Sequence, residues 1–426
     1  MNFAVIGSGG REHAICYKLI QSKKIKKLLC MPGNAGTKNI AENINLDISN
    51  FDEIYKVIQK NSIDIVIVGP EQPLVDGIVD FLMKKKIRVF GPDKFASQLE
   101  GSKAFMKDIC KKNNIPTAKF GIFENFEKAS DFLNKNKFPI VVKADGLAAG
   151  KGVSICNSIN EAEEKIKEIF DGKFKSSRKV VLEEFLEGEE LSYFSIVDEN
   201  NYKFFGSAQD HKKVGTGDTG PNTGGMGAYS PSTILTYELE KKIKTRIIDP
   251  TLKAMQNLKH PFKGFLYAGL MISKGEPYLI EYNIRMGDPE CQVLMMRLKT
   301  DLVEIIDAAT KGSLNNLKIE WNNDSCITIV MCAKGYPGNY IKNSEIKNLQ
   351  DIFQDQNYQI FHAGTYEKNK KIFSNGGRVL NITSLGKNLS EARNKSLENI
   401  KKIKWDDGFY REDIAWKAIK DENNKR

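Results

Sequence analysis

The first hundred residues alternate between short apolar runs of strand length and longer amphipathic segments of helix length. Such alternation is typical of a parallel sheet with helices on both faces, because parallel neighbours are joined by helical crossovers. In sheets of this kind, ligands gather at the carboxyl ends of the strands. We therefore predict an open α/β sheet with strands at 3–6, 27–31, 63–68 and 88–90, and helices at 12–21, 51–60 and 74–85.

Glycine-containing loops follow the first three predicted strands, at 7–11, 32–37 and 69–71. The first loop is similar to a dinucleotide-binding fingerprint, but Glu12 stands where G-x-G-x-x-G requires its last glycine. The second strand ends in Cys30 and Met31 rather than in the acidic residue that holds a ribose hydroxyl. An NAD site is therefore not expected. One phosphate suits backbone N–H groups at a helix N-terminus, and three structural turns are the alternative.

The pattern changes after Pro92, where a helix at 94–113 is followed by hairpin strands instead of crossovers. A second change follows a polar stretch at 311–324. The length of 426 residues corresponds to about three domains of ordinary size. We predict an N-terminal domain at 1–100, a middle domain at 101–325 and a C-terminal domain at 326–426.

Composition argues against several classes of protein. No apolar run approaches the roughly 18 residues of a membrane-spanning helix, and the first residues lack the pattern of a secretory signal. The seven cysteines are scattered without a CxxC pair, so neither a disulfide framework nor a zinc site is indicated. The net charge is +10, but the lysine clusters are not interleaved with aromatic residues. We expect a cytoplasmic protein that binds neither membranes nor nucleic acids.

A glycine-rich segment at 144–152 lies between predicted strands at 139–143 and 153–156. It is not a Walker A loop, because its spacing is one residue short and it leads into a strand rather than a helix. A flexible hairpin of this kind can close over a triphosphate, with backbone N–H groups and Lys151 facing the phosphates while Lys143 adds a charge from the strand. A plain hairpin turn is the alternative.

Two further segments carry polar residues in patterns that suit a nucleotide. The segment at 180–192 is a hydrophobic strand that runs into a carboxylate cluster, as in an adenosine pocket or in an ordinary solvated loop. On the predicted strand that begins at 278, Glu281, Asn283 and Arg285 share one face, because residues two apart point the same way. Oxygen donors followed by a guanidinium suit Mg²⁺ and a triphosphate, whereas the wet face of a half-exposed strand is the alternative.

A long stretch rich in glycine and polar residues lies at 209–230 and indicates a functional loop rather than a connector. His211 lies within it and is a candidate general base. The sequence shows no carboxylate pattern that would orient its ring, so a substrate-binding or structural role is favoured.

Together these segments resemble the phosphoribosylamine–glycine ligases (glycinamide ribonucleotide synthetases) of the ATP-grasp superfamily. The resemblance is most specific at 145–152, 220–230 and 287–290, and departs from the family pattern at Met286, Cys291 and Ala333, none of which is a charged ligand position. It implies an α/β and α+β multidomain fold: a Rossmann-like N-terminal sheet, an ATP-grasp core with a mobile lid near 120–187, and a C-terminal mixed α/β domain. Matching segments are 7–13, 32–37, 68–71, 99–103, 143–152, 183–186, 218–231, 264–270, 283–290 and 375–379.

The resemblance implies that ATP phosphorylates the carboxylate of glycine, and that the amine of 5-phosphoribosylamine then attacks the glycyl phosphate. The products would be glycinamide ribonucleotide, ADP and phosphate, in the second step of purine biosynthesis. Mg²⁺ or Mn²⁺ would accompany ATP, and the partners would be these small molecules, with the chain a monomer. The alternatives are another ATP-grasp ligase with a different carboxylate, a dinucleotide-dependent oxidoreductase and a basic nucleic-acid-binding module.

The resemblance also assigns roles to individual positions. The residues that would act on the transferred phosphoryl group are Arg285, Lys143 and Asp288. The residues that would bind ATP are Lys103, Lys143, Gly150, Lys151, Gly152, Glu183, Glu184, Phe185, Leu186 and Glu190. The residues that would bind the other substrates are Gly9, Gly10, Gly33, Asn34, Gly36, Thr37, Glu71, Asp210, Asp218, Pro221, Asn222 and Gly225. The metal ligands would be Glu281 and Asn283.

Overall fold

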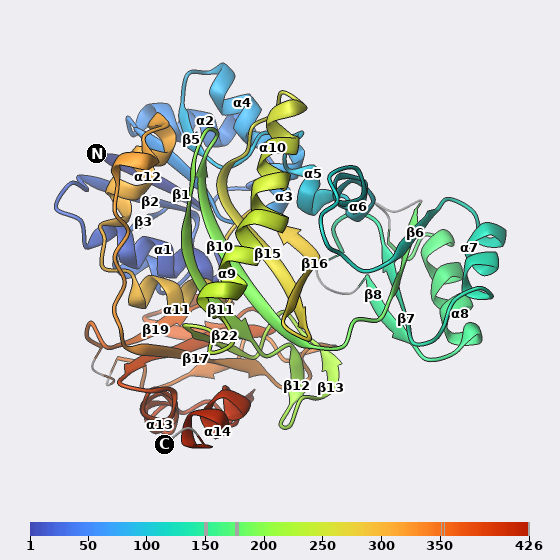
Figure 1. Ribbon diagram of the computed structural model, residues 1–426. Helices are drawn as coiled ribbons and strands as arrows, with labels where there is room; N and C mark the ends of the chain where they lie inside the picture. The colour runs from blue at the N-terminus through green and yellow to red at the C-terminus, as the bar shows by residue number, and fades with distance from the viewer. Residues whose placement is uncertain (149–151, 175–178, 351, 353, 425–426) are drawn as a thin grey trace.

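The computed structural model describes residues 1–148, 152–174, 179–350, 352 and 354–424 (Figure 1). Gly150 and Lys151 of the predicted phosphate loop therefore lie outside the described residues. No helix of the described part is long and apolar enough to cross a membrane.

The N-terminal residues form a five-stranded sheet in the order β3-β2-β1-β4-β5, in which every pair is parallel. The central strand is buried on both faces, since Ala4 and Ile6 pack into one apolar cluster while Phe3 and Val5 pack into another. Burial on both faces requires an unbroken apolar run, which is why this strand is visible in the sequence. The predicted parallel sheet is confirmed. Its strands are β1 (Asn2–Gly7), β2 (Lys27–Pro32), β3 (Glu42–Asn43), β4 (Ile65–Val68) and β5 (Arg88–Phe90).

The helix predicted at 51–60 has these bounds in the structure, but two longer predicted helices are divided. The predicted helix at 74–85 is divided by Gly77, whose φ of 99° lies in the left-handed region, into α3 (Glu71–Asp76) and α4 (Ile78–Lys84). The predicted helix at 94–113 is divided at Ser102, whose backbone is extended and whose hydroxyl accepts the Phe105 N–H at 3.1 Å. The other helices here are α1 (Gly10–Ile20), η1 (Thr37–Asn39), α2 (Phe51–Lys60), α5 (Gln98–Gly101) and α6 (Lys103–Lys112).

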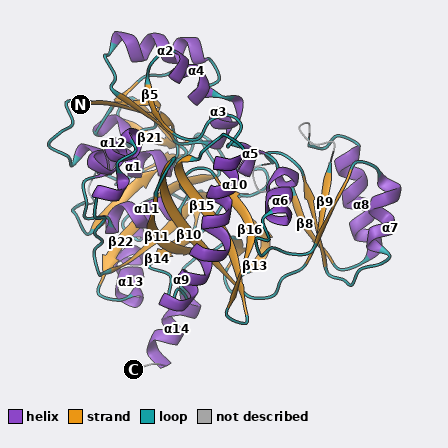
Figure 2. Ribbon diagram, turned by 45° about the horizontal axis from the view of Figure 1, so that its top comes forward, coloured by secondary structure: helices purple, strands orange, loops and turns teal. Residues whose placement is uncertain are grey.

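A small antiparallel sheet in the order β6-β9-β7-β8 follows α6 and stands to one side of the molecule in both views (Figures 1 and 2). Two helices pack on its outer face and close a separate apolar core around Leu133, Ile140, Ile166 and Leu182. A core of its own would allow this unit to move as a body. Its elements are β6 (Phe120–Phe123), α7 (Phe126–Leu133), β7 (Ile140–Ala144), β8 (Val153–Cys156), α8 (Ile159–Phe170) and β9 (Val180–Glu184).

The largest sheet has nine strands and runs β16-β15-β10-β11-β14-β17-β22-β19, with β23 added beside β17. Strand β14 joins its two halves, because it pairs with β11 on one side and with β17 on the other. The sheet is thus continuous across residue 325, and the domain boundary predicted there stays a prediction. The strands are β10 (Glu189–Asp198), β11 (Tyr202–Asp210), β14 (Gly227–Ser230), β15 (Lys263–Ser273), β16 (Glu276–Asn283), β17 (Ser325–Ala333), β19 (Tyr358–His362), β22 (Arg378–Gly386) and β23 (Gly408–Phe409).

The remaining elements cover this sheet or extend from its edges. Helix α13 packs against β17 and β22, near the C-terminal helix α14 (Figure 1). These elements are β12 (Lys213–Gly215), β13 (Thr219–Asn222), α9 (Tyr237–Ile243), η2 (Lys244–Ile248), α10 (Asp249–Asn257), α11 (Glu290–Arg297), α12 (Leu302–Lys311), η3 (Leu314–Asn316), β18 (Glu345–Ile346), β20 (Thr365–Lys368), β21 (Lys371–Ser374), α13 (Leu389–Ile400) and α14 (Trp416–Asn424).

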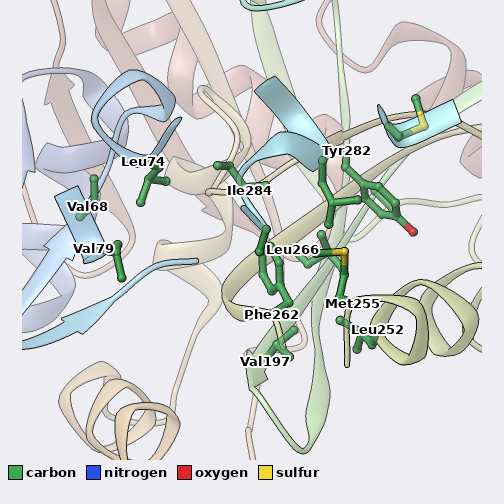
Figure 3. Packing of buried hydrophobic residues seen from close by; sticks show 14 of the residues in the cluster. Val68, Leu74, Val79, Val197, Leu252, Met255, Phe262, Leu266, Tyr282 and Ile284 are labelled. Atoms are coloured by element: carbon green, nitrogen blue, oxygen red, sulfur yellow. The ribbon is translucent and has the colours of Figure 1, made fainter. Parts of the chain in front are cut away.

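One apolar cluster joins the N-terminal sheet to the large sheet (Figure 3). Val68 and Leu74 enter it from the N-terminal region, and Leu266 and Tyr282 enter it from β15 and β16. Ile284 lies between the two groups and is 1% exposed. Because Ile284 directly follows Asn283, this packing fixes the end of β16 against the N-terminal sheet.

Candidate active site

Strand β16 places the two predicted metal ligands on one face. Glu281 lies opposite Gly269 on β15, and a Cβ at Gly269 would come within 3.3 Å of the Glu281 Cγ. Burial raises the pKa of the Glu281 carboxyl, but neighbouring cations outweigh this effect and hold the pKa below its usual value. Four cations thus act on this one carboxylate, and several of them also pair with other carboxylates of the site. The cations are Lys212, Lys143, Lys103 and Arg285.

One of these lysines lies on the small sheet, and another lies on the helix that precedes it. The Lys143 ammonium on β7 is 2.8 Å from a Glu183 carboxylate oxygen and 3.5 Å from the Ile280 carbonyl oxygen of β16. Lys103, at the start of α6, donates to the Gly146 carbonyl at 3.0 Å. Lys103 therefore ties the beginning of the glycine-rich segment to the site.

The same segment is anchored at the N-terminus of α6. Asp145 accepts the Ala104 N–H at 3.1 Å, and its carboxylate also accepts the Ser102 hydroxyl. A carboxylate at a helix N-terminus is stabilised by the unpaired N–H groups and the helix dipole. At the other end of the segment, a Cβ on Gly152 would lie 2.7 Å from the Ala148 side chain, so the chain is closely packed there.

The residues predicted to frame adenine differ in their surroundings. Glu184 accepts the Lys119 N–H at 2.9 Å, while Phe185 is exposed and Leu186 is half-buried. The Glu183 carboxylate points instead into the domain, where it is buried among lysines. The Glu190 carboxylate accepts a hydrogen bond from the Lys212 ammonium at 2.5 Å.

A small cavity beside Glu281 is lined by both Glu190 and Lys212. The Glu190 and Asp210 carboxylates outweigh the effect of burial and raise the pKa of the Lys212 ammonium. Burial, reinforced by Glu290 and Glu190 and opposed by Lys212, raises the pKa of Asp210 to about 7. Ser192 and Tyr267 also line the cavity, and their hydroxyl oxygens are 2.9 Å apart.

The first glycine loop is already filled by a side chain of the protein. The Glu12 carboxylate accepts the Gly9 N–H at 2.6 Å and pairs with the Arg11 guanidinium at 2.5 Å. A Cβ at Gly7 would come within 2.6 Å of Glu12, and one at Gly69 within 2.1 Å. The carboxylate thus occupies the crevice between these two loops, and a phosphate at the Gly9 N–H would compete with it.

The second glycine loop is held by its own hydrogen bonds. The Asn34 side chain accepts the Gly36 and Thr37 N–H groups at 2.9 and 3.0 Å, and it donates to the carbonyl oxygen of His362 at 2.8 Å. Gly36 packs tightly on the rings of His13 and His362. Gly33 has a φ of 75°, which glycine adopts without strain. This loop therefore connects the N-terminal sheet to β19, and a Cβ on the neighbouring Gly10 would clash with Asn381 and Gln292.

A turn at 285–289 brings all three parts of the chain together. The Arg285 guanidinium pairs with Glu71 at 3.2 Å and with Glu100 at 2.9 Å. Burial raises the pKa of Glu100 to about 7, against the opposing effect of Arg285. The Met286 carbonyl accepts from Arg285 and from Arg11, both at 3.2 Å.

The next residue of functional interest in this turn is Asp288. Its carboxylate accepts from the Gln292 side chain at 2.8 Å, and its backbone carbonyl accepts from Arg378 of β22. Burial raises the pKa of Asp288, but Arg378 and Arg11 hold it below its usual value. Arg378 also donates to the Gly224 carbonyl, and Gly225 packs on Pro289. The loop after β13 therefore packs against this turn.

The hairpin of β12 and β13 lies apart from these contacts. Asp218 pairs with Arg411 at 3.1 Å and with Lys417 at 2.9 Å, while Pro221 and Asn222 are exposed. His211 accepts the Ala415 N–H on its Nε2 at 3.2 Å, which agrees with a structural role for this ring.

Three family models match the chain. The model described as phosphoribosylglycinamide synthetase, N domain, matches residues 1–100, the ATP-grasp (A) domain matches 101–291, and the C domain matches 326–417. The phosphoribosylamine–glycine ligase of Brucella melitensis is 47% identical over 427 residues, covering 100% of both chains. The chain belongs to the phosphoribosylglycinamide synthetase family.

Solved structures support this membership. The phosphoribosylamine–glycine ligase of Thermotoga maritima is 34% identical, with a TM-score of 0.86 over 97% of this chain and 100% of that one. A biotin carboxylase domain from Hydrogenobacter thermophilus has a TM-score of 0.73 at 16% identity, over 96% of this chain and 91% of that one, and so shares the fold. The predicted resemblance and fold class are confirmed.

In this member of the phosphoribosylglycinamide synthetase family, the predicted residues fall into groups. Around β16 the structure gathers Lys103, Lys143, Glu281 and Arg285, with Glu71 paired to the arginine. Asp288 lies in the same turn but faces Arg378 and Arg11. It does not bring Asp218 to that group, and it commits the side chains of Asn34 and Thr37 to their own loop.

Several charged residues of the site were missed by sequence reasoning. Lys212 lies in a segment noted for its polar character, but adjacent lysines look like a solvated surface. Glu100 joins the site by pairing with Arg285, which lies 185 positions further along the chain. Arg11 joins it by donating to the carbonyl of Met286, which lies 275 positions further along. For Lys212, the available signal is its position two residues after Asp210, the last residue of β11.

Proposed function

We propose that the chain is an ATP-dependent carbon–nitrogen ligase that joins glycine to 5-phosphoribosylamine through glycyl phosphate. The products are glycinamide ribonucleotide, ADP and phosphate, in the second step of de novo purine biosynthesis. Membership of the phosphoribosylglycinamide synthetase family over the whole chain supports this reaction. The observation that carries it is the approach of two lysines to the strand of Glu281 and to the glycine-rich segment. The Lys143 ammonium is 3.5 Å from the Ile280 carbonyl oxygen of β16, and Lys103 donates to the Gly146 carbonyl at 3.0 Å, which is an arrangement suited to a triphosphate.

We assign the ATP phosphates to Lys103 and Lys143, together with the glycine-rich segment and its residues Gly150, Lys151 and Gly152. The ammonium groups neutralise phosphate charge and hold the chain of phosphates in one orientation, which lowers the entropic part of the barrier. Glu184, Phe185 and Leu186 would frame the adenine ring, and Glu183 would fix Lys143 from behind. Glu190 would accept hydrogen bonds from the ribose.

Glu281 and Asn283 are suited to a divalent ion shared with the substrate. Among the described residues, no group of three or more His, Cys, Asp and Glu side chains could hold a metal alone. Mg²⁺ commonly binds through one or two protein oxygens and completes its shell with phosphates and water, so these two residues fit Mg²⁺ or Mn²⁺ bound with ATP. When bound, such an ion neutralises charge on the transferring phosphoryl group.

We assign the transferred phosphoryl group to Arg285, with Lys143 on its other side and Asp288 holding the turn. A planar guanidinium donates two parallel hydrogen bonds to phosphate oxygens. In the structure Glu71 and Glu100 fix this guanidinium, so its position is set before any substrate binds. Such preorganisation is the main source of electrostatic catalysis.

The remaining substrate residues belong to the cavity beside Glu281 and to three loops. Asp210 and Glu71 would contact glycine or phosphoribosylamine, together with Lys212 of the cavity beside Glu281. The ribosyl phosphate would lie among the loops at 9–10, 33–37 and 218–225, and at the Gly9 N–H it would have to displace the Glu12 carboxylate. An acyl phosphate must be kept from water, so we expect the segment at 144–152 and the lid at 120–187 to close over it.

The domain division at 100 and 325, a cytoplasmic location and a monomeric state complete the proposal. Neither nucleic acid nor membrane is part of it. The partners are ATP, glycine and 5-phosphoribosylamine.

Phosphate release measured with ATP, glycine and freshly made phosphoribosylamine tests the proposal. We expect release to require all three, and omission of any one to abolish it. Replacing glycine with other carboxylic acids is the matched control. If another acid supports faster release than glycine, the chain is a different ATP-grasp ligase and the proposal is wrong.

A further inference from the structure

Lys107 is a completely buried lysine on α6 that has no part in the proposed chemistry. Its side chain is 0% exposed, and its ammonium donates to the Thr117 hydroxyl at 2.6 Å. The ammonium is also 3.0 Å from a Glu183 carboxylate oxygen. Lysine is rarely buried unless it is paired, because an ammonium loses its hydration inside the protein. The position therefore has a specific purpose.

The partner of Lys107 is shared with a residue of the nucleotide site. The other Glu183 oxygen is 2.8 Å from the Lys143 ammonium, and the Glu183 and Lys143 side chains are 4% and 6% exposed. Two buried cations thus divide one carboxylate between them. The group as a whole keeps one surplus positive charge, and Lys143 is the member that borders β16.

The same lysine is connected to the strand that carries the metal ligands. The Thr117 hydroxyl that accepts from Lys107 donates to the Leu279 carbonyl of β16 at 2.6 Å. The Leu279 N–H in turn donates to the Pro116 carbonyl at 2.8 Å. Leu279 lies two residues before Glu281. Lys107 thus contacts the small sheet through Glu183. Through the Thr117 hydroxyl it is also linked by hydrogen bonds to Leu279 of β16.

We propose that Lys107 is a positioning residue of the nucleotide site, which acts on ATP through Glu183 and Lys143. Because Lys107 pairs with one of the two Glu183 oxygens, Glu183 does not fully neutralise Lys143. The Lys143 charge then remains available to the nucleotide phosphates. Through Thr117 it also fixes the small sheet relative to β16. The proposal rests on the proposed function only in naming the ligand as an adenine nucleotide.

Lys107→Met tests the proposal, because methionine keeps most of the apolar length of lysine and removes the charge. Glu183 then pairs with Lys143 alone. We expect the dissociation constant for ADP to rise about tenfold, as for a lost charge-assisted hydrogen bond, and KM for glycine to change less than about twofold. Lys111→Met is the matched control, since Lys111 lies on the same helix and is exposed. Unchanged ADP affinity in Lys107→Met would overturn the proposal.

A double variant separates the charge effect from packing. In Lys107→Met with Glu183→Gln, the competing carboxylate is gone and the Lys143 charge is restored. We expect ADP affinity to recover by at least about threefold relative to Lys107→Met. No recovery would mean that Lys107 acts only through packing, and the proposal would be rejected.

Lys107→Arg covers the case in which the methionine variant does not fold. Arginine keeps the charge and can still pair with Glu183. We expect it to retain ADP affinity within about threefold of the unmodified chain, and a loss as large as that expected for methionine would contradict the charge argument. ADP binding by calorimetry requires no ligation. A chain that binds ADP as expected but does not use glycine would refute the proposed reaction and leave this inference standing.

Discussion

Two glycine-rich loops of this molecule each follow a buried strand, yet they have opposite surroundings. The loop after β1 is filled by the Glu12 carboxylate, which accepts the Gly9 N–H. The segment after β7 has lysines beside it: Lys103 donates to its Gly146 carbonyl, and both Lys103 and Lys143 act on the Glu281 carboxylate of the site. Glycine provides room for a close approach of the backbone in both places. The charge of the neighbours differs, since a carboxylate accepts the backbone N–H in the first loop, whereas lysines, which attract phosphate, lie beside the second.

Glu12→Ala is expected to give the largest effect on stability. It leaves Arg11 without its carboxylate partner in a buried position, and the Gly9 N–H without its acceptor. Breaking a buried pair in this way costs about 3–5 kcal/mol of unfolding free energy. Chemical denaturation measures the loss, and Glu53→Ala is the control, since Glu53 is exposed on α2. An unchanged denaturation midpoint would show that the first loop does not depend on its carboxylate.

Glu281→Ala should have the opposite profile. Because Glu281 lies among four cations at the end of β16, its loss removes a metal ligand rather than a structural partner. We expect turnover to fall on the order of 10²-fold or more, with a smaller loss of stability than in Glu12→Ala, because several of the cations keep other carboxylate partners. Glu276→Ala on the same strand is the control, because its ion pairs with Lys242 and Arg246 are on the surface. Near-normal glycine-dependent ADP formation in Glu281→Ala would refute the metal assignment.

This contrast shows which features the sequence could reveal. The apolar runs of β1 and β4 predict a parallel sheet, and the two-residue period places Glu281 and Asn283 on one face. These features depend on neighbours along the chain. Glu12 is also close in sequence to the loop after β1. The sequence alone does not show that its carboxylate turns back and accepts the Gly9 N–H.

Contacts between distant segments account for most of what was missed. Arg285 meets Glu71 and Glu100 only because the N-terminal sheet packs against the end of β16. Lys107 looks like any other lysine of an amphipathic helix until the small sheet brings Glu183 beside it. The pairing partner of a buried charge is set by tertiary packing, which a single sequence does not contain.

The two histidines that pack on the second glycine loop should make the stability of the protein depend on pH. Burial lowers the pKa of His362 to about 4 and also lowers that of His13 well below its usual value. In the unfolded chain both imidazoles titrate near 6.5. Between about pH 6.5 and about pH 4 the unfolded chain therefore binds protons that the folded chain does not, so stability falls as pH falls through this window.

Denaturation at pH 7.5 and pH 5.5 measures this effect. We expect His362 alone to account for about 1 kcal/mol of the loss at pH 5.5, and His362→Gln to reduce the difference between the two pH values by that amount. An equal pH dependence in the variant would mean that the contact between the second loop and β19 is not sensitive to protonation.

Lys151→Ala is expected to give the smallest effect and concerns the segment after β7. If Lys151 serves mainly to close this segment over the triphosphate, its loss leaves the phosphate contacts of Lys103 and Lys143 in place and admits water to the acyl phosphate. The ratio of ADP formed to glycinamide ribonucleotide formed should then rise about threefold, while KM for ATP changes less. Lys179→Ala, at the start of β9, is the comparison variant for removal of a lysine from the same small domain. Unchanged coupling in Lys151→Ala would mean that other residues exclude water from the acyl phosphate. Lys151 would then contribute its charge to the segment after β7, rather than closure of that segment.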